Sequence, residues 1–217
     1  MAKTRPSWEA AYNIMDRRII INIGRQFGSG GKQVASEIGH ILDIPVYDNE
    51  LVVKAAEESG FSRELFDRSD ERRRFLMLSN IFSSNRFGST TGNCINDNDL
   101  FRIQSEVIRE IAAKGDAIFV GRAADYILRD MNCLDVFISA PLENRIQRVS
   151  ERLGISAEDA EILIDRKDKA REQYYNFMTF GNWGVASNYD LCIDSSILGI
   201  EGTAGFVIEF ARKRGLL

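Results

Sequence analysis

A glycine-rich segment follows the first strongly apolar stretch of the chain. In the sequence IIINIGRQFGSGGKQVASEI, glycines 28, 30 and 31 stand between an apolar run and an amphipathic one. Glycines allow positive φ angles, so successive backbone amides can face one anion. A helix that follows adds free N–H groups and the positive end of its dipole. The segment therefore predicts a phosphate-binding loop at 28–32, and an ordinary strand–helix turn is the less favoured alternative.

This loop departs from the common P-loop pattern GxxxxGK[ST]. Counted back from Lys32, the first glycine of the pattern falls on Gln26. The residue after the lysine is Gln33, which has no hydroxyl for magnesium. Phosphate binding by the backbone does not depend on these two positions. We expect the phosphates of a nucleotide to contact Gly28, Ser29, Gly30, Gly31, Lys32 and Gln33.

A second register is available for the same loop. When the segment GSG is laid over the glycine–serine–glycine of small-molecule kinases, the lysine position becomes Gly31. A cation is present nearby in both registers, since Arg25 or Lys32 could supply it. Ser29 or Ser36 could replace the missing hydroxyl. The sequence leaves both choices open.

Arginines recur at helical spacing in two later segments. Arg145, Arg148 and Arg152 stand at i, i+3 and i+7, and Asp168 and Arg171 share a helix face farther on. The planar fork of arginine binds two phosphate oxygens and stays charged, as phosphoryl transfer requires. Solvated, ion-paired helix faces are the alternative, but the triplet directly follows an apolar run, which favours phosphate binding. Our candidate catalytic cations are Arg25, Lys32, Arg148 and Arg171, and Arg145 is a candidate nucleotide ligand.

Short apolar runs alternate with longer amphipathic stretches along the chain. The runs are rich in Ile, Val and Phe and lack polar alternation, which is typical of strands buried on both faces of a parallel sheet. Such alternation of strands and helices predicts a doubly wound α/β fold with helices on both faces. The expected strands are 18–23, 44–47, 117–120, 134–139 and 189–194.

Sequence patterns predict where several of the helices between these runs begin and end. Apolar spacing predicts a helix that begins near Lys32, and others over residues 103–111 and 142–153. Ser156 followed by Asp159 predicts a capped helix start. The last helix should bury a stripe formed by Ile200, Phe206, Val207 and Phe210.

Two long insertions interrupt the alternation. Residues 48–98 contain a charged cluster and a polar tract, and residues 154–188 contain a charge-dense helix and the aromatic segment NFMTFGNWGVASN. Long insertions in compact domains often cover ligands. We therefore expect residues 48–98 to bind a phosphate acceptor and residues 154–188 to form a lid. In that lid, Phe180 and Trp183 could stack on a base or pack against the body, whereas Tyr174 and Tyr175 look structural.

The composition of the chain favours some classes of protein and argues against others. The chain has 217 residues, 44% of them hydrophobic, and a formal net charge of −4, which fits one globular domain and gives no support for nucleic-acid binding. No run approaches the roughly 20 apolar residues of a membrane helix, so we expect a cytoplasmic protein without membrane contact. Three separated cysteines and one histidine argue against a disulfide framework or a structural metal site. We expect Cys133 and Cys192 to be packing residues and His40 to lie on the surface.

Several segments together resemble the cytidylate kinase-like proteins, a divergent branch beside the bacterial cytidylate kinases. They are GRQFGSGGKQVA, IPVYDNEL, IFVGRAADYIL, DVFISAPLENRIQRV, DRKDKAREQYY and YDLCIDSSILGIE. The resemblance runs from residue 19 to the end and is poor over residues 60–98. It implies a three-layer P-loop NTPase fold with a five-stranded parallel sheet of order 2-3-1-4-5. It also implies transfer of the ATP γ-phosphoryl group to a nucleoside monophosphate, with Mg²⁺.

The resemblance also implies roles for single residues. Arg122 resembles the arginine of the family's GR motif, which holds the acceptor phosphate. Asp48 resembles the aspartate of its acceptor-binding segment. Asp168 and Arg171 resemble the lid pair that contacts the pyrimidine base and the phosphate. No protein metal ligands are implied.

Two positions differ from the family pattern and keep other functions open. The aspartate after the GR motif is Ala123 here, and the lid arginine expected four residues before Asp168 is Ile164. Our leading hypothesis is a CMP or dCMP kinase, followed by a kinase of another small metabolite. The third hypothesis is a nucleotide-binding sensor without transfer activity.

Overall fold

Five parallel strands form the centre of the molecule. The computed structural model describes residues 18–48 and 97–217. The strands are β1 (Ile20–Arg25), β2 (Val46–Tyr47), β3 (Ala117–Val120), β4 (Cys133–Ser139) and β5 (Leu191–Asp194). Their order is β2-β3-β1-β4-β5, and each neighbouring pair is parallel. The expected sheet and strand order are confirmed.

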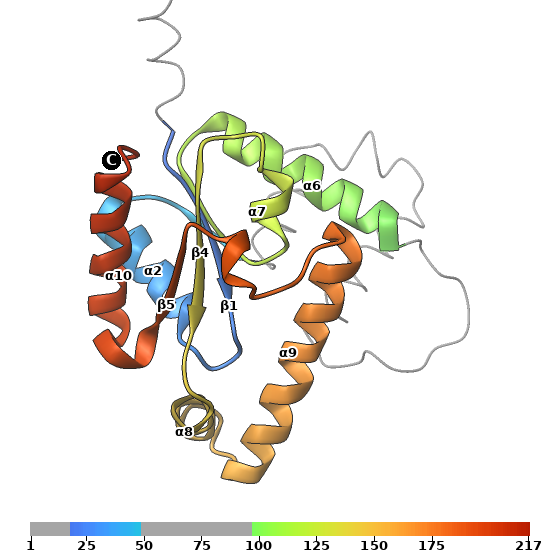
Figure 1. Cartoon of the computed structure of the whole chain (residues 1–217), viewed down its shortest axis with the longest axis vertical. Helices are drawn as coiled ribbons and strands as arrows, with labels where there is room; N and C mark the ends of the chain where they lie inside the picture. Colours follow the sequence, from blue (N-terminus) through green and yellow to red (C-terminus); the bar gives the residue numbers. More distant parts are fainter. Residues whose placement is uncertain (1–17, 49–96) are drawn as a thin grey trace, which may run out of the picture.

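Helices cover both faces of this sheet (Figure 1). On one face, α2 (Gly31–Leu42) and α10 (Ser195–Lys213) pack on a core that includes Ile21, Ile23 and Val136. On the other face, α6 (Asp97–Lys114) and α7 (Ala124–Ile127) pack on Ile20 and Phe119. Successive strand residues point to opposite faces, so apolar runs without alternation bury both sides. The three-layer α/β architecture is confirmed.

Two further helices, α8 (Leu142–Leu153) and α9 (Ala157–Thr179), follow β4, and a 3₁₀ turn, η1 (Ala186–Asn188), precedes β5. Helix α8 lies at the bottom of Figure 1, beyond the carboxyl ends of the strands, and α9 begins there and rises beside the sheet. Ser156 caps α9, because its Oγ accepts a hydrogen bond from the Asp159 N–H at 3.1 Å, as expected. Val149 and Ile164 form a small core between α8 and α9 that also packs against Phe27 of the glycine loop.

The expected element boundaries were close, and two expectations about burial were wrong. Strand β1 runs two residues past the expected end, to Arg25. Cys192 is exposed, because β5 is an edge strand with one incompletely covered face. Phe206 is 48% exposed, because α10 turns that position away from α2. Cys133 is buried, as expected.

Some expectations fall on residues that the structure does not describe. These are the amino-terminal segment 1–17 and residues 49–96, which include most of the expected acceptor-binding insertion and Cys94. Among residues 18–48 and 97–217, no helix is both long and apolar enough to cross a membrane.

Candidate active site

The glycine loop joins the end of β1 to the start of α2. Gly28 and Gly30 have φ angles of 81° and 82°, and Gly30 is the N-cap of α2. A Cβ atom at Gly28 would lie 2.9 Å from a methyl carbon of Val149, and one at Gly30 would overlap Ile200. Glycine is therefore required twice over, by backbone conformation and by the close packing of α8 and α10.

Polar side chains hold the loop in shape. Ser29 donates its hydroxyl to the Gln26 carbonyl at 2.9 Å, and the Gln26 side chain accepts from the Ala140 N–H at 3.2 Å. The buried Ser195 hydroxyl donates to the Ser29 carbonyl. Ser36 donates to a carbonyl within α2 at 3.1 Å. Both serines that could replace the missing P-loop hydroxyl therefore donate their protons to the backbone.

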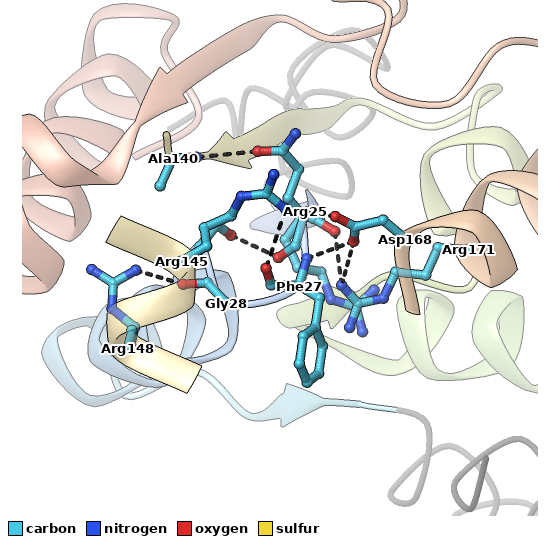
Figure 2. Close-up of polar contacts among 10 residues, drawn as sticks. Arg25, Phe27, Gly28, Ala140, Arg145, Arg148, Asp168 and Arg171 are labelled. Carbon is cyan, nitrogen blue, oxygen red and sulfur yellow. Dashed lines mark hydrogen bonds and ion pairs between the residues drawn. The ribbon is translucent and has the colours of Figure 1, made fainter. Parts of the chain in front are cut away.

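The arginine face of α8 lies against the loop (Figure 2). Arg145 Nη1 donates to the Phe27 carbonyl at 3.4 Å, and Arg148 Nη1 donates to the Gly28 carbonyl at 2.7 Å. The Arg152 guanidinium lies 5.3 Å from the centre of the Phe27 ring. All three arginines predicted to share one face thus contact the glycine loop at Phe27 or Gly28, which favours a ligand site over a purely solvated helix surface.

Asp168 of α9 binds the loop from the other side (Figure 2). Its Oδ1 accepts from the Phe27 N–H at 2.7 Å, and its Oδ2 accepts from Arg145 Nη1 at 2.7 Å. Arg171 lies 3.5 Å from Asp168 Oδ1 and donates to the Arg25 carbonyl at 3.2 Å. Burial raises the pKa of Asp168, and the Phe27 amide and both arginines oppose that rise. A carboxylate therefore binds the amide of the residue that directly precedes the predicted phosphate-binding loop.

Three arginines from separate elements meet where β1 and β3 end. Burial lowers the pKa of Arg25, and the charges of Arg171 and Arg122 lower it further. Burial also lowers the pKa of Arg122 and of Arg171. Asp48 and Asp168 act in the opposite direction on Arg25. Guanidinium groups this close together and this poorly solvated favour an anion among them.

Lys32 and Gln33 lie at the edge of this cluster. Lys32 Nζ pairs with a carboxylate oxygen of Asp48 at 2.6 Å, and the lysine side chain is 68% exposed. Gln33 is also exposed. Both residues are thus exposed on the first turn of α2, and Asp48 connects Lys32 to the arginine cluster through its charge on Arg25 and Arg122.

Several aromatic residues of α9 and the segment after it pack on the body, whereas Phe177 and Phe180 are 60% and 94% exposed, so the packing considered for Phe180 is not observed. Tyr174 donates its hydroxyl to Gln104 at 2.8 Å, and the Arg122 guanidinium lies 5.5 Å from its ring centre. Trp183 contacts Phe137 of β4 edge to face, with ring centres 5.4 Å apart. Of the two uses considered for Trp183, packing on the body is therefore the one observed.

Sequence reasoning missed several residues that shape the site. Gln26, Ser195 and Phe27 hold or surround the loop, and Tyr174 contacts Arg122. Ser195 had a signal, since it follows a predicted strand in a motif shared with the family. Gln26 and Phe27 act mainly through long-range contacts that no local spacing reveals.

A comparison with models of protein families shows which family this chain belongs to. The model of the cytidylate kinase-like family matches residues 20–197. The chain belongs to the cytidylate kinase-like family. As a member of a kinase family with this sheet and loop, it is a phosphotransferase.

Individual relatives agree with this assignment. A protein named cytidylate kinase from Methanopyrus kandleri is 28% identical over 188 residues, which cover 82% of this chain and 85% of that protein. A second cytidylate kinase, from Pyrococcus horikoshii, is 26% identical over 196 residues, which cover 88% of this chain and 86% of that protein.

Solved structures show the same architecture. An uncharacterized protein from Eubacterium ventriosum matches with a TM-score of 0.66 and 28% identity, covering 89% of this chain and 98% of that one. Shikimate kinase from Bacteroides thetaiotaomicron matches with a TM-score of 0.51 and 11% identity, covering 89% and 98%. The shikimate kinase likeness concerns the fold alone.

Proposed function

We propose that this protein transfers the γ-phosphoryl group of ATP to a nucleoside monophosphate, with CMP or dCMP as the leading acceptor. The observation that carries the proposal is the meeting of three arginines beside the glycine loop: the Arg25 guanidinium lies against Gly121, next to Arg122, and Arg171 donates to the Arg25 carbonyl at 3.2 Å. Phosphoryl transfer needs little covalent help from a protein; it needs aligned oxygens and neutralised charge. The relatives named cytidylate kinase support the choice of acceptor.

Each part of the site has a role in this reaction. The loop amides and the start of α2 bind the donor phosphates. Arg145 and Arg148 hold the loop carbonyls and lie along the donor side. Arg122, beside β3, binds the acceptor phosphate, and Arg171 lies close enough to act on both sides. The expected small-molecule partners are nucleotides rather than nucleic acid, and the expected compartment is the cytoplasm.

Magnesium fits this site as a companion of the nucleotide. Mg²⁺ in kinases is bound by substrate phosphates, waters and one or two carboxylates. Both oxygens of Asp168 are already bound, by the Phe27 amide and by Arg145, so Asp48 is the nearby carboxylate that would approach the ion, with the phosphates and water as its main ligands. Bound there, the ion would supply positive charge to the phosphates.

The segment 154–188 is proposed to shield the reaction from water. Its helix α9 supplies Asp168 and Arg171 directly to the loop, so any movement of α9 would alter the charge around the phosphates. Exclusion of water prevents hydrolysis of the donor.

The test of the proposed function is ADP formation from Mg·ATP with a panel of nucleoside monophosphates and small metabolites. We expect turnover with CMP or dCMP. Arg122→Ala should raise the KM for the acceptor by about a hundredfold while the KM for ATP changes little, as expected for loss of a charge-assisted phosphate contact. Arg129→Ala is the matched control, because Arg129 is exposed and stacks on Tyr126.

One observation favours a second candidate, a kinase of another small phosphorylated or hydroxylated metabolite. Ile164 stands where the family has a lid arginine, and it is 2% exposed within the core between α8 and α9. This position therefore cannot present a charge to a pyrimidine nucleotide. Turnover with a non-nucleotide acceptor only would establish this second function, and nucleotide binding without turnover on any acceptor would indicate a sensor.

A further inference from the structure

We propose that Arg25 provides the cation that a standard P-loop takes from its lysine, and that residue 31 is glycine to make room for it. The proposal rests on the phosphoryl transfer proposed above and assigns the contact with the transferred group. It decides between Arg25 and Lys32, which the sequence leaves open.

Residues 25 and 31, where this chain differs from the standard pattern, face each other across the loop. In the pattern GxxxxGK, the lysine follows the first glycine by six positions. With the lysine position at 31, the first glycine falls at 25, which is arginine here. A Cβ atom at Gly31 would lie 2.6 Å from Arg25 Cβ and 3.1 Å from its Cγ. A side chain at residue 31 and the arginine at residue 25 therefore exclude each other, and the usual glycine and lysine have become arginine and glycine.

The Arg25 side chain extends from the donor loop towards the acceptor side. Its guanidinium lies directly against Gly121, where an added Cβ atom would overlap Nη1 and lie 2.8 Å from Cζ. Gly121 has a φ angle of 76° and precedes Arg122, the proposed ligand of the acceptor phosphate. Arg25 thus spans the gap between the first turn of α2 and the acceptor arginine, the interval that a transferred phosphoryl group must cross.

Lys32 is less well placed for the same task. Its side chain is 68% exposed, and its ammonium pairs with Asp48 at 2.6 Å. Arg25 by contrast places its guanidinium against Gly121, next to Arg122, and its carbonyl accepts a hydrogen bond from Arg171 at 3.2 Å. Three converging guanidinium groups match the three equatorial oxygens of a phosphoryl group in transfer.

The step that Arg25 serves involves no proton on the arginine. An oxygen of the acceptor phosphate forms a new bond to the γ-phosphorus while the bond to the β,γ-bridging oxygen breaks. The electron pair of the broken bond remains on the β-phosphate of ADP. Arg25 binds the oxygens of the γ-phosphoryl group during its transfer and stays positively charged throughout.

Kinetics of matched variants test this assignment. Arg25→Ala should lower kcat by about a hundredfold to a thousandfold, the loss expected for one preorganised charge contact. The factor by which Lys32→Ala lowers kcat should be less than a tenth of that for Arg25→Ala, and the kcat of Arg129→Ala should match that of the wild type. The double variant R25G/G31K restores the pattern GxxxxGK, so it should recover at least about tenfold in kcat over Arg25→Gly alone. Unchanged kcat in Arg25→Ala, or a larger loss in Lys32→Ala, would overturn the assignment.

Measurements of nucleotide binding distinguish a failure of this assignment from a failure of the proposed function. Arg25→Ala should weaken AMP-PNP about tenfold or more relative to ADP, because only the former carries a γ-phosphate group. This ratio is measurable even if no acceptor is turned over, in which case the proposed function fails and Arg25 is still tested. Equal weakening of both nucleotides would refute the role. Unchanged circular dichroism and a cooperative melting transition confirm that each variant is folded.

Discussion

Asp135 is a carboxylate in the middle of the sheet, and its replacement by asparagine should stabilise the protein. It lies opposite Asn22 in the register of β4 and β1. Asp135 Oδ1 accepts a hydrogen bond from Asn22 Nδ2 at 2.8 Å. Asn22 is 2% exposed, and its Oδ1 has no hydrogen-bond partner within the described part of the chain. A donor at position 135 would therefore satisfy a buried acceptor.

The size of the effect follows from the acidity of Asp135. Burial raises its pKa from 3.8 to about 6, and the neighbouring carboxylates Asp125 and Asp190 also raise it. Between these two pH values the folded chain keeps the proton and the unfolded chain has lost it. The contribution of Asp135 to stability is therefore fully present below pH 3.8 and is lost as pH rises through about 6, by about 1.36 kcal/mol per pH unit. Over this interval the loss is about 3 kcal/mol.

Asp135→Asn removes the charge and adds an N–H donor beside Asn22, the residue whose Oδ1 lacks a partner in the described part of the chain. We expect the variant to exceed the wild type by up to about 3 kcal/mol near pH 8 and by only about 1 kcal/mol near pH 4.5. Urea unfolding at the two pH values measures both differences. Asp130→Asn, at an exposed position, is the control and should stay within about 0.5 kcal/mol at both. A variant less stable than the wild type near pH 8, or a difference that does not grow with pH, would refute the reasoning.

Three further predictions concern loop and helix geometry. Ser195→Ala removes the buried hydrogen bond to the Ser29 carbonyl and should cost about 1–3 kcal/mol in urea unfolding; an unchanged midpoint would show that the bond contributes nothing. Ser156→Ala removes the cap of α9 and should cost about 1 kcal/mol by thermal unfolding, whereas Ser156→Asp should keep most of the stability. Gly121→Ala forces a side chain to a φ angle of 76° against the Arg25 guanidinium. It should cost about 1–3 kcal/mol and raise the KM for the acceptor, and normal kinetics would contradict this placement of Arg25.

The sheet and its helices were predictable because each depends on local pattern. Strands buried on both faces have no polar alternation, and helix periodicity alone placed Arg145 and Arg148 on one face. The capped start of α9 was likewise readable from Ser156 and Asp159. The order of the strands came from the resemblance to the family, because long-range pairing leaves no local trace.

The contacts between elements were harder to predict. The lid pair Asp168 and Arg171 was identified from sequence, but the bond from Asp168 to the Phe27 amide requires α9 to pack on the loop. Arg25 was one of two candidate cations, and only its distances to Gly31 and Gly121 separate it from Lys32. The packing role expected of Cys192 was wrong, because apolar composition cannot tell an edge strand from a central one.

The central claim is phosphoryl transfer at the arginine cluster, and its most direct test is single-turnover transfer from γ-labelled ATP to CMP. The wild-type chain with Mg²⁺ should move the label to CDP, and Arg122→Ala should slow that transfer at subsaturating CMP without loss of ATP binding. Label that stays on ATP with every nucleoside monophosphate, while ATP binds normally, would contradict the claim.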